Sequence, residues 1–336
     1  MNGNAEIQHS LYDANSGGVS FQKLTKHEIA SKYCLSTRDL RSIDLPSIGF
    51  PHILIRQNTI LIHMFSLRLL VQADQVLMFH VEGSVDLEEA NQWRVFNHDI
   101  EGKLRGNHGS GISAILPFEL RVLEAALSST TSTIEAEYLL ANEQISEALR
   151  LLDLQMHGDE ESLIHVELRT LLDLVQVLSG IEQRARLVRN AVQEVLNDDD
   201  DMAAMYLSDK RAGNPHTSDD HQDVEYLLEA YFKTSDAVVQ KAKSLLGKIQ
   251  RKEENIQSIL NVRRNQIMVL ETKIEIVMVG LGSATLVAGF YGMNVINYLE
   301  ESAWAFGVLT SLCLVGTAII WRYGLRQLRQ IQRVQI

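Results

Sequence analysis

The sequence predicts an α+β soluble domain, a sheet covered by long helices, followed by a long stalk helix and two transmembrane helices. Three observations lead to this fold. Short β-rich runs alternate with turn residues over the first part of the chain. From Pro117 onward, apolar residues recur at the three- and four-residue spacing of amphipathic helices. Near the C-terminal end, residues 276–290 and 302–321 carry no charged side chain.

The composition of the 336-residue chain narrows the functional classes. Its formal net charge of −12 argues against a nucleic-acid partner, which would call for a basic face. Its two cysteines, Cys34 and Cys313, fall in the soluble part and at membrane depth, so a reducing compartment is expected. GNHGSG at Gly106–Gly111 lacks the Lys-Ser/Thr of a phosphate-binding loop and is expected to be a surface loop. The sequence shows no nucleophile-base set of the kind that would indicate an enzyme.

The soluble domain is expected to span residues 1–207. Five runs in its first part are strand candidates: Phe21–Leu24, His52–Ile55, Thr59–Met64, Leu67–Val71 and Val76–Val81. LPFELRVLEAAL at Leu116–Leu127 then starts a helical pattern, which Leu139–Leu154 and Leu163–Leu196 continue. The polar segment 208–220, with Gly and Pro, is predicted to be a loop between two long helices.

One unbroken helical stretch runs from about His221 to Gly292. At 1.5 Å per residue such a helix is roughly 100 Å long, some three times the hydrocarbon core of a bilayer. We therefore expect a stalk over residues 221–275 that continues as the first transmembrane helix over residues 276–294.

Charges around the two spans predict their orientation. An acidic loop at 295–301 is followed by the second transmembrane helix at 302–321 and a basic tail at 322–336. Arginines precede the first span and follow the second, whereas the loop carries only Glu300 and Glu301. By the positive-inside rule, both ends of the chain face the same inner compartment.

A polar stripe runs along the first span. Steps of four and three residues connect Arg264, Met268, Glu271, Glu275, Met278, Gly282, Thr285 and Gly289. Two spans cannot enclose a pore, so a polar stripe that lines one requires several copies around an axis. The alternative is that Gly282 and Gly289 only permit close helix packing and that Glu271 and Glu275 lie in water.

The stretch YGMN at Tyr291–Asn294, followed by an acidic loop and a second span, resembles the signature of CorA-type magnesium channels. Further segments resemble, in order, the motifs of the mitochondrial inner-membrane branch of that superfamily: RDLRSID at Arg38–Asp44, LPFELRVLEAAL, LNDDDDMAAMYLS at Leu196–Ser208 and YLLEAYF at Tyr226–Phe232. The resemblance covers nearly the whole chain.

The resemblance implies a CorA-like homopentameric channel that carries Mg²⁺ into the mitochondrial matrix. Five copies of the long helix would line the pore, and the protein would span the inner membrane twice with both termini in the matrix. No Arg- and Ser-rich presequence is present, so any transit peptide is expected to be absent from this chain. Asn261 stands where the family pattern has an aspartate.

Gly292, Met293 and Asn294 form the expected selectivity filter. Mg²⁺ sheds its water reluctantly, so five Asn294 carboxamides are expected to grip the water shell. Gly292 would let the helix end. Glu300 and Glu301, repeated around the mouth, would concentrate cations, the alternative being simple solvation.

A brake on the inflow is also expected, because the membrane potential alone favours accumulation. By resemblance, acidic side chains of adjacent subunits bind regulatory Mg²⁺, with Glu119, Glu194 and Asp198 as candidates; helix capping is the alternative for the aspartates. Arg264 would form a positive ring at the inner end of the pore, and Met268 a hydrophobic constriction.

Two other functions remain open. A non-conducting regulatory subunit would keep them while working with a paralogous subunit. A coiled-coil membrane tether would need neither Asn294 nor the polar stripe.

Overall fold

The computed structural model describes residues 6–13, 19–33, 35–36, 38–40, 50–80, 96–100, 116–156, 161–293 and 304–334. GNHGSG, expected to be a surface loop, lies outside these residues. Contacts divide the chain into two compact units, residues 1–249 and 250–336. This division falls inside the longest helix rather than at residue 207.

The first unit contains a six-stranded antiparallel sheet with the order β2-β1-β6-β5-β4-β3. Its strands are β1 (Glu6–Asp13), β2 (Val19–Thr25), β3 (His52–Ile55), β4 (Ile60–Met64), β5 (Leu67–Val71) and β6 (Gln75–His80). Strands β3 and β5 have the predicted bounds, and β4 and β6 differ from the prediction by one residue at their ends. Strand β1 was not predicted.

Both faces of the central strands are buried, which explains why their sequences are apolar without alternation. Every residue of β4 and β5 is buried. On one face, Leu61, Leu70 and Leu77 pack against the region of helix α1 (Lys26–Lys32). Alternate residues of the same strands point to the other face, where α4 and α5 contact the sheet.

Helix α1 was also missed, although its start carries a recognisable signal. Thr25 and Glu28 form a capping box, in which the Thr25 side chain accepts from the Glu28 backbone N–H and the Glu28 carboxylate accepts from the Thr25 backbone N–H. Ile29, fully buried, anchors α1 to the sheet.

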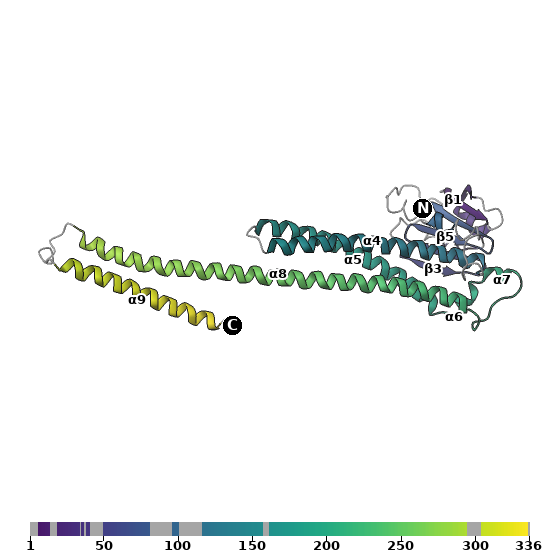
Figure 1. Cartoon of the computed structure of the whole chain (residues 1–336). Coiled ribbons are helices and arrows are strands. Elements are labelled where there is room, and N and C mark those ends of the chain that lie inside the picture. Colours follow the sequence, from purple (N-terminus) through teal and green to yellow (C-terminus); the bar gives the residue numbers. More distant parts are fainter. Residues whose placement is uncertain are drawn as a thin grey trace. The chain divides into compact units, whose positions relative to one another are not determined.

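The long helices are those that the apolar spacing predicts. They are α4 (Phe118–Met156), α5 (Glu161–Leu196) and α8 (Gln222–Tyr291). In the first unit α4 and α5 run alongside one another beside the sheet (Figure 1). The fold class expected from the sequence is therefore confirmed: long helices cover a sheet, and one helix continues toward the apolar C-terminal segments.

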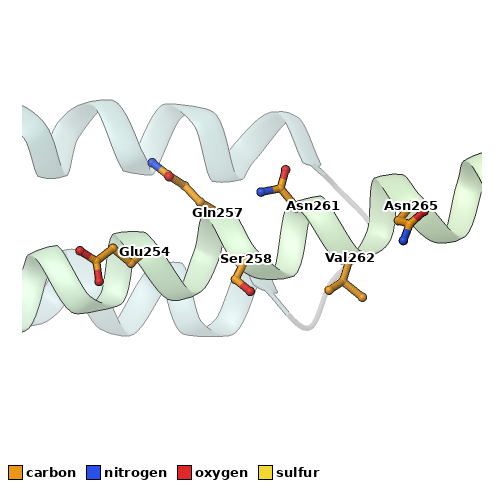
Figure 2. A pocket seen from close by; sticks show the side chains of 6 residues that line it. All are labelled: Glu254, Gln257, Ser258, Asn261, Val262 and Asn265. Carbon is orange, nitrogen blue, oxygen red and sulfur yellow. The ribbon is translucent and has the colours of Figure 1, made fainter. Parts of the chain in front are cut away.

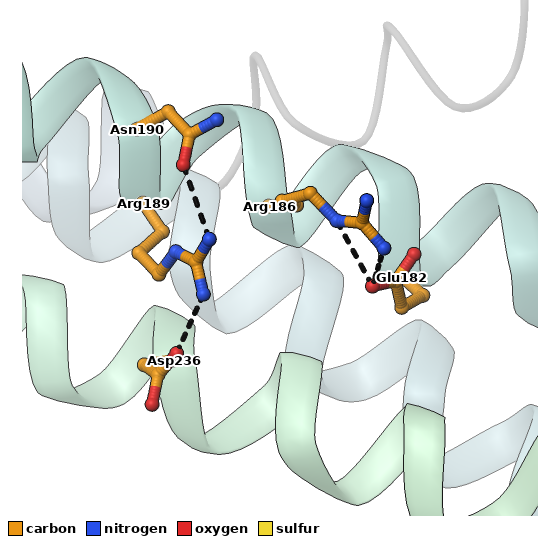
Figure 3. Close-up of polar contacts among 5 residues, drawn as sticks. All are labelled: Glu182, Arg186, Arg189, Asn190 and Asp236. Carbon is orange, nitrogen blue, oxygen red and sulfur yellow. Dashed lines mark hydrogen bonds and ion pairs between the residues drawn. The ribbon is translucent and has the colours of Figure 1, made fainter.

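An ion pair joins the early part of α8 to α5. Arg189 of α5 donates from Nη1 to Oδ1 of Asp236 on α8 at 2.8 Å and from Nη2 to Oδ1 of Asn190 at 3.2 Å (Figure 3). One helical turn away, Arg186 Nε donates to Glu182 at 3.1 Å. The Arg189–Asp236 pair, together with buried residues such as Val224 and Leu228, holds the start of α8 in the soluble unit.

The segment predicted to be a loop at 208–220 is partly helical. After α5 come two short helices, α6 (Asp199–Ala204) and α7 (Leu207–Arg211). The remaining turn is held by His216, whose ring lies 3.0 Å from Asp209 Oδ2 and stacks on Tyr206 at 4.0 Å. Gly213, with φ of 91°, provides the left-handed residue that the turn requires.

A buried histidine in the sheet makes stability depend on pH. His63 of β4 lies opposite His52 and Arg68, and burial, followed by the proximity of His52 and then Arg68, lowers its pKa to about 4. Since an unfolded histidine titrates near 6.5, the unfolded chain binds more protons than the folded chain between these values. We expect His63 to cost about 2 kcal/mol of folding stability between pH 7.5 and pH 5.

The measurement is urea unfolding of the full chain in a neutral detergent at both pH values. His63→Gln should lose less stability on acidification than the wild type. His98→Gln is the control, because that side chain is 92% exposed. Equal acid sensitivity of His63→Gln and the wild type would contradict the assignment.

Candidate functional site

Two close contacts hold the end of α8 against α9 (Ala305–Val334) (Figure 1). At the first, Thr317 Oγ1 of α9 lies 3.3 Å from the Gly280 carbonyl oxygen, to which it donates. At the second, a Cβ placed on Gly324 of α9 would lie 2.6 Å from Ile276 Cγ2 of α8. Both helices are long and apolar enough to cross a membrane. Small residues thus determine which face of α8 meets α9.

The Gly324 contact gives a prediction about the stability of this helix pair. Gly324→Val should lower the melting temperature of the detergent-solubilised protein by several degrees, because Ile276 occupies the space that a side chain needs. Gly316→Val is the matched control on α9, since nothing lies within 4 Å of a Cβ there. Adding Ile276→Ala should restore most of the loss. Equal effects of the two glycine substitutions would refute the contact.

All eight residues of the polar stripe are exposed in the single chain. At about 100° per residue, the centre of the stripe lies roughly 150° around α8 from Ile276 and Gly280, the residues that contact α9. Helix α9 therefore leaves the polar stripe uncovered.

The two glycines of the polar stripe do not serve packing between these helices. A Cβ on Gly282 or Gly289 would meet no atom within 4 Å, whereas Gly280 and Gly324 make the close contacts. Reading the sequence alone missed Gly280 and Gly324. The only available signal was the four-residue spacing of Ile276, Gly280 and Ala284, which becomes meaningful once the position of α9 is known.

The polar stripe continues toward the soluble end of α8. Going back from Arg264, the same steps of three and four residues reach Asn261, Gln257 and Glu254. These side chains, with Ser258, Val262 and Asn265, line an open groove of about 500 Å³ along the helix (Figure 2). Carboxamide and carboxylate groups there could contact a hydrated ion without removing its water.

The first two filter residues follow directly on the end of α8 at Tyr291. Gly292 N donates to the Ala288 carbonyl at 2.9 Å, and a Cβ on Gly292 would lie 3.3 Å from that oxygen. Glycine therefore permits a close approach here, without a left-handed backbone. Met293 is exposed. Asn294, Glu300 and Glu301 lie outside the described residues.

The structure gives Glu119 a structural role. Its side chain is fully buried, and its two carboxylate oxygens accept from Ser208 N at 2.7 Å and from Ser208 Oγ at 2.6 Å. Glu119 thereby ties the start of α4 to α7. A carboxylate used in this way is not presented to a neighbouring subunit.

Glu194 and Asp198 are exposed near the start of α6. Asp198 is the N-cap residue of α6, since its Oδ1 accepts from Asp201 N at 3.1 Å, so the capping interpretation is confirmed for this residue. Burial, followed by the nearby Asp198, raises the pKa of Asp201. The carboxylates of the run Asp198–Asp201 therefore repel one another, and a bound cation would reduce this repulsion.

Within one chain, the described residues contain no group of three or more His, Cys, Asp or Glu side chains placed to hold a metal ion.

The chain is similar to a family model and to several curated proteins, all of which are named magnesium transporters. A family model described as magnesium transporter MRS2-like matches residues 11–264. The chain is 42% identical over 311 residues to the mitochondrial inner membrane magnesium transporter mrs2 of Aspergillus fumigatus, covering 93% of this chain and 50% of that protein. It is 36% identical to the mitochondrial inner membrane magnesium transporter LPE10 of Yarrowia lipolytica, covering 98% and 70%. The chain thus spans about half the length of several relatives that it matches.

Solved structures agree on the fold. The CorA magnesium transporter from Methanocaldococcus jannaschii matches with a TM-score of 0.53 at 14% identity, covering 94% of this chain and 96% of that one. The full-length CmaX protein matches with a TM-score of 0.53 at 12% identity, covering 98% and 99%.

Proposed function

The chain belongs to the MRS2-like family of magnesium transporters, and on that basis we propose that it forms a Mg²⁺ channel of the mitochondrial inner membrane. The observation that carries the proposal is the exposed polar stripe, which faces away from α9 and leads to Gly292 and Met293. A membrane anchor would have no use for such a stripe.

The channel we propose is a homopentamer. The described part of one chain supplies two candidate spans, which cannot enclose a pore, so the polar stripes of several copies must face a common axis. Helix α9, attached to the opposite side of α8, would then form the outer ring against lipid. The match to the CorA fold supports this arrangement.

The filter would select Mg²⁺ by binding the water shell of the hydrated ion. Complete dehydration of Mg²⁺ is costly and slow, and a ring of five Asn294 carboxamide oxygens can hold the hydrated ion instead. Glu300 and Glu301 on the connecting loop would raise the local concentration of cations at the mouth. Further in, Met268 would form a constriction and Arg264 a positive ring that limits the flow of cations.

The membrane potential would drive the influx. With both termini in the matrix, as the distribution of arginines predicts, an inside-negative potential favours entry of a divalent ion by roughly 4.6 kcal/mol per 100 mV. No chemical step is required, which agrees with the names of the relatives as transporters rather than enzymes.

The decisive experiment is Mg²⁺ uptake into liposomes that contain the purified protein and a Mg²⁺ indicator. We expect uptake that rises with an inside-negative potential and saturates with external Mg²⁺. Absence of uptake by a well-folded oligomer would reject an autonomous channel. Uptake that appears only after a related channel is added would identify a regulatory subunit.

Feedback by matrix Mg²⁺ is the second part of the proposal. Mg²⁺ bound between Glu194 and Asp198 of adjacent subunits would favour one arrangement of the oligomer, and a ligand shifts an equilibrium only through its different affinity for the two states. We do not include Glu119 among these ligands, because both of its carboxylate oxygens accept hydrogen bonds from Ser208.

The brake can be tested with substitutions that remove charge alone. Asn can replace Asp as an N-cap, so Glu194→Gln with Asp198→Asn should preserve α6. We expect this variant to conduct as well as the wild type at low internal Mg²⁺ but to lose most of the slowing at high internal Mg²⁺. Glu147→Gln, an exposed carboxylate on α4, is the control. Unchanged inhibition would place the brake elsewhere, most simply at Arg264 and Met268.

A further inference from the structure

The turn between α7 and α8 closes around one histidine, His216, whose side chain is 20% exposed. Its Nε2 lies 3.0 Å from Oδ2 of Asp209 on α7. Its Nδ1 lies 2.9 Å from the carbonyl oxygen and 3.0 Å from Oδ2 of Asp220, which is two residues before the start of α8. His216 therefore connects α7 to the residues that lead into the longest helix.

Both ring nitrogens of His216 face groups that can only accept a hydrogen bond. Carboxylate and carbonyl oxygens carry no proton to donate, so each nitrogen must itself be a donor. A neutral imidazole has one N–H, whereas the protonated ring has two. Tyr206 stacks on the ring at 4.0 Å and offers its aromatic face to the positive charge. The geometry of the turn thus fits the protonated histidine.

The surroundings of His216 also favour the protonated ring energetically. Burial on its own lowers the pKa of His216. The hydrogen bonds to Asp209 and Asp220, together with the negative charges of these carboxylates, outweigh burial and raise the pKa above its ordinary value. The charge of His216 is therefore expected to change near neutral pH or above.

Further charged side chains lie on α7, in the turn and at the start of α8: Lys210, Arg211, Asp219, His221 and Asp223. Arg211 pairs with Asp74 at 2.7 Å, and Nε2 of His221 lies 3.8 Å from Asp199. Among the described residues, the charged side chains that contact the His216 ring are Asp209 and Asp220. The titration of His216 therefore acts mainly on these two carboxylates.

We propose that His216 is a pH-sensitive latch, formed with Asp209 and Asp220, between α7 and the start of α8. When the ring loses one proton, the other stays on Nδ1, because this nitrogen faces two acceptors on Asp220. Nε2 then presents a lone pair to the Asp209 carboxylate, and that contact opens. The latch is fully closed below about pH 6.5, the pKa of an unfolded histidine, and opens as the pH rises through the higher pKa of the folded state.

The latch acts on the turn because α7 has other attachments to the soluble unit. Ser208 donates to Glu119 of α4, and Arg211 Nη1 donates to Asp74 Oδ2 at 2.7 Å. Opening the latch thus loosens the turn, while α7 stays in place and buried residues such as Val224 keep α8 packed. Any effect on conduction would rest on the proposed function, in which α8 lines the pore. The latch itself does not.

The test is amide hydrogen exchange of the full chain in a neutral detergent at pH 6 and pH 8.5, corrected for the intrinsic exchange rate. The amides of Asn214 and Asp220 are hydrogen-bonded within the turn, so they report its opening. We expect their corrected exchange to be about threefold to fivefold faster at pH 8.5, the range for a partly exposed ion pair. The amides of α5 should show no such change.

Three variants distinguish the latch from a general effect of pH. In Asp209→Asn, the new amide group can donate to the unprotonated Nε2, so the turn should stay protected at both pH values. His216→Gln cannot titrate, and its turn should exchange at pH 6 as fast as the wild type does at pH 8.5. Asp219→Asn, which alters an exposed carboxylate of the same turn, is the control and should behave as the wild type.

NMR titration of isotope-labelled histidine side chains gives a second readout that does not depend on exchange. The signal missing from His216→Gln identifies His216 in the wild type. We expect its pKa to lie above the ordinary value and to fall in Asp209→Asn, because one carboxylate is removed. The latch would be refuted by a His216 pKa at or below the ordinary value, by corrected exchange that does not depend on pH, or by the same dependence in His216→Gln. None of these outcomes bears on Mg²⁺ conduction.

Discussion

The Asn294→Ala variant is expected to take up no Mg²⁺ above the background of protein-free liposomes. In the proposed channel, the Asn294 side chain is the group that contacts the water shell of the ion, and alanine offers no oxygen to replace it. Since each subunit contributes one copy, a single substitution removes the entire ring. The fluorescence of a trapped Mg²⁺ indicator measures the loss.

The neighbouring Asn297 offers a matched control, because it is a second carboxamide three residues further along the same segment. Asn297→Ala should retain most of the uptake. Size-exclusion chromatography must give the same oligomer for both variants, so that loss of conduction is not mistaken for loss of assembly. Normal uptake by Asn294→Ala would remove the filter from the mechanism.

The elements that could be predicted from the sequence are those whose signal is local. The strongly apolar runs of β3, β4 and β5 have bounds that follow from the residues themselves. Helix α8 is equally clear, because nothing between Gln222 and Tyr291 breaks the helical pattern. Strand β1 is different: EIQHSLYD is half polar, and its strand conformation depends on pairing with β6, some 60 residues later.

The short helices α1 and α7 were not predicted, for two different reasons. For α1, the Thr25 and Glu28 capping box is written in the sequence as TKHE and could have been recognised. For α7, the stabilising contact is long-range, since Glu119 accepts from Ser208 across 89 positions of sequence. No local pattern could have indicated that this glutamate is buried and bonded rather than available for a metal ion.

The candidate pore surface was predictable in part. The spacing of the polar stripe could be read directly from the sequence, but its accessibility depends on where α9 packs. Gly280 and Gly324, which fix that packing, look no different in sequence from Gly282 and Gly289, which make no contact. Only the structure distinguishes the glycines that join the helices from those left facing outward.

This distinction leads to the second large effect that we expect, a block of conduction by thiol modification of the polar stripe. In a background with Cys34→Ser and Cys313→Ala, Met278→Cys and Thr285→Cys should each react with a charged methanethiosulfonate reagent. A bulky charge on five subunits at one level of a narrow pore should stop nearly all Mg²⁺ uptake. The rate of uptake before and after the reagent is the measurement, and reduction of the mixed disulfide should restore it.

Val277→Cys and Val287→Cys are the controls, because these neighbouring residues point away from the polar stripe yet are 38% and 39% exposed in the single chain. Facing lipid or a neighbouring helix, they should react slowly with a charged reagent and keep their uptake. If all four positions were blocked alike, the whole surface of α8 would be in water and the polar stripe would not define the pore. If only the two valine positions were blocked, the helix would have to be rotated by nearly half a turn. Helix α9, which contacts Ile276 and Gly280, could then not form the outer ring of the proposed channel.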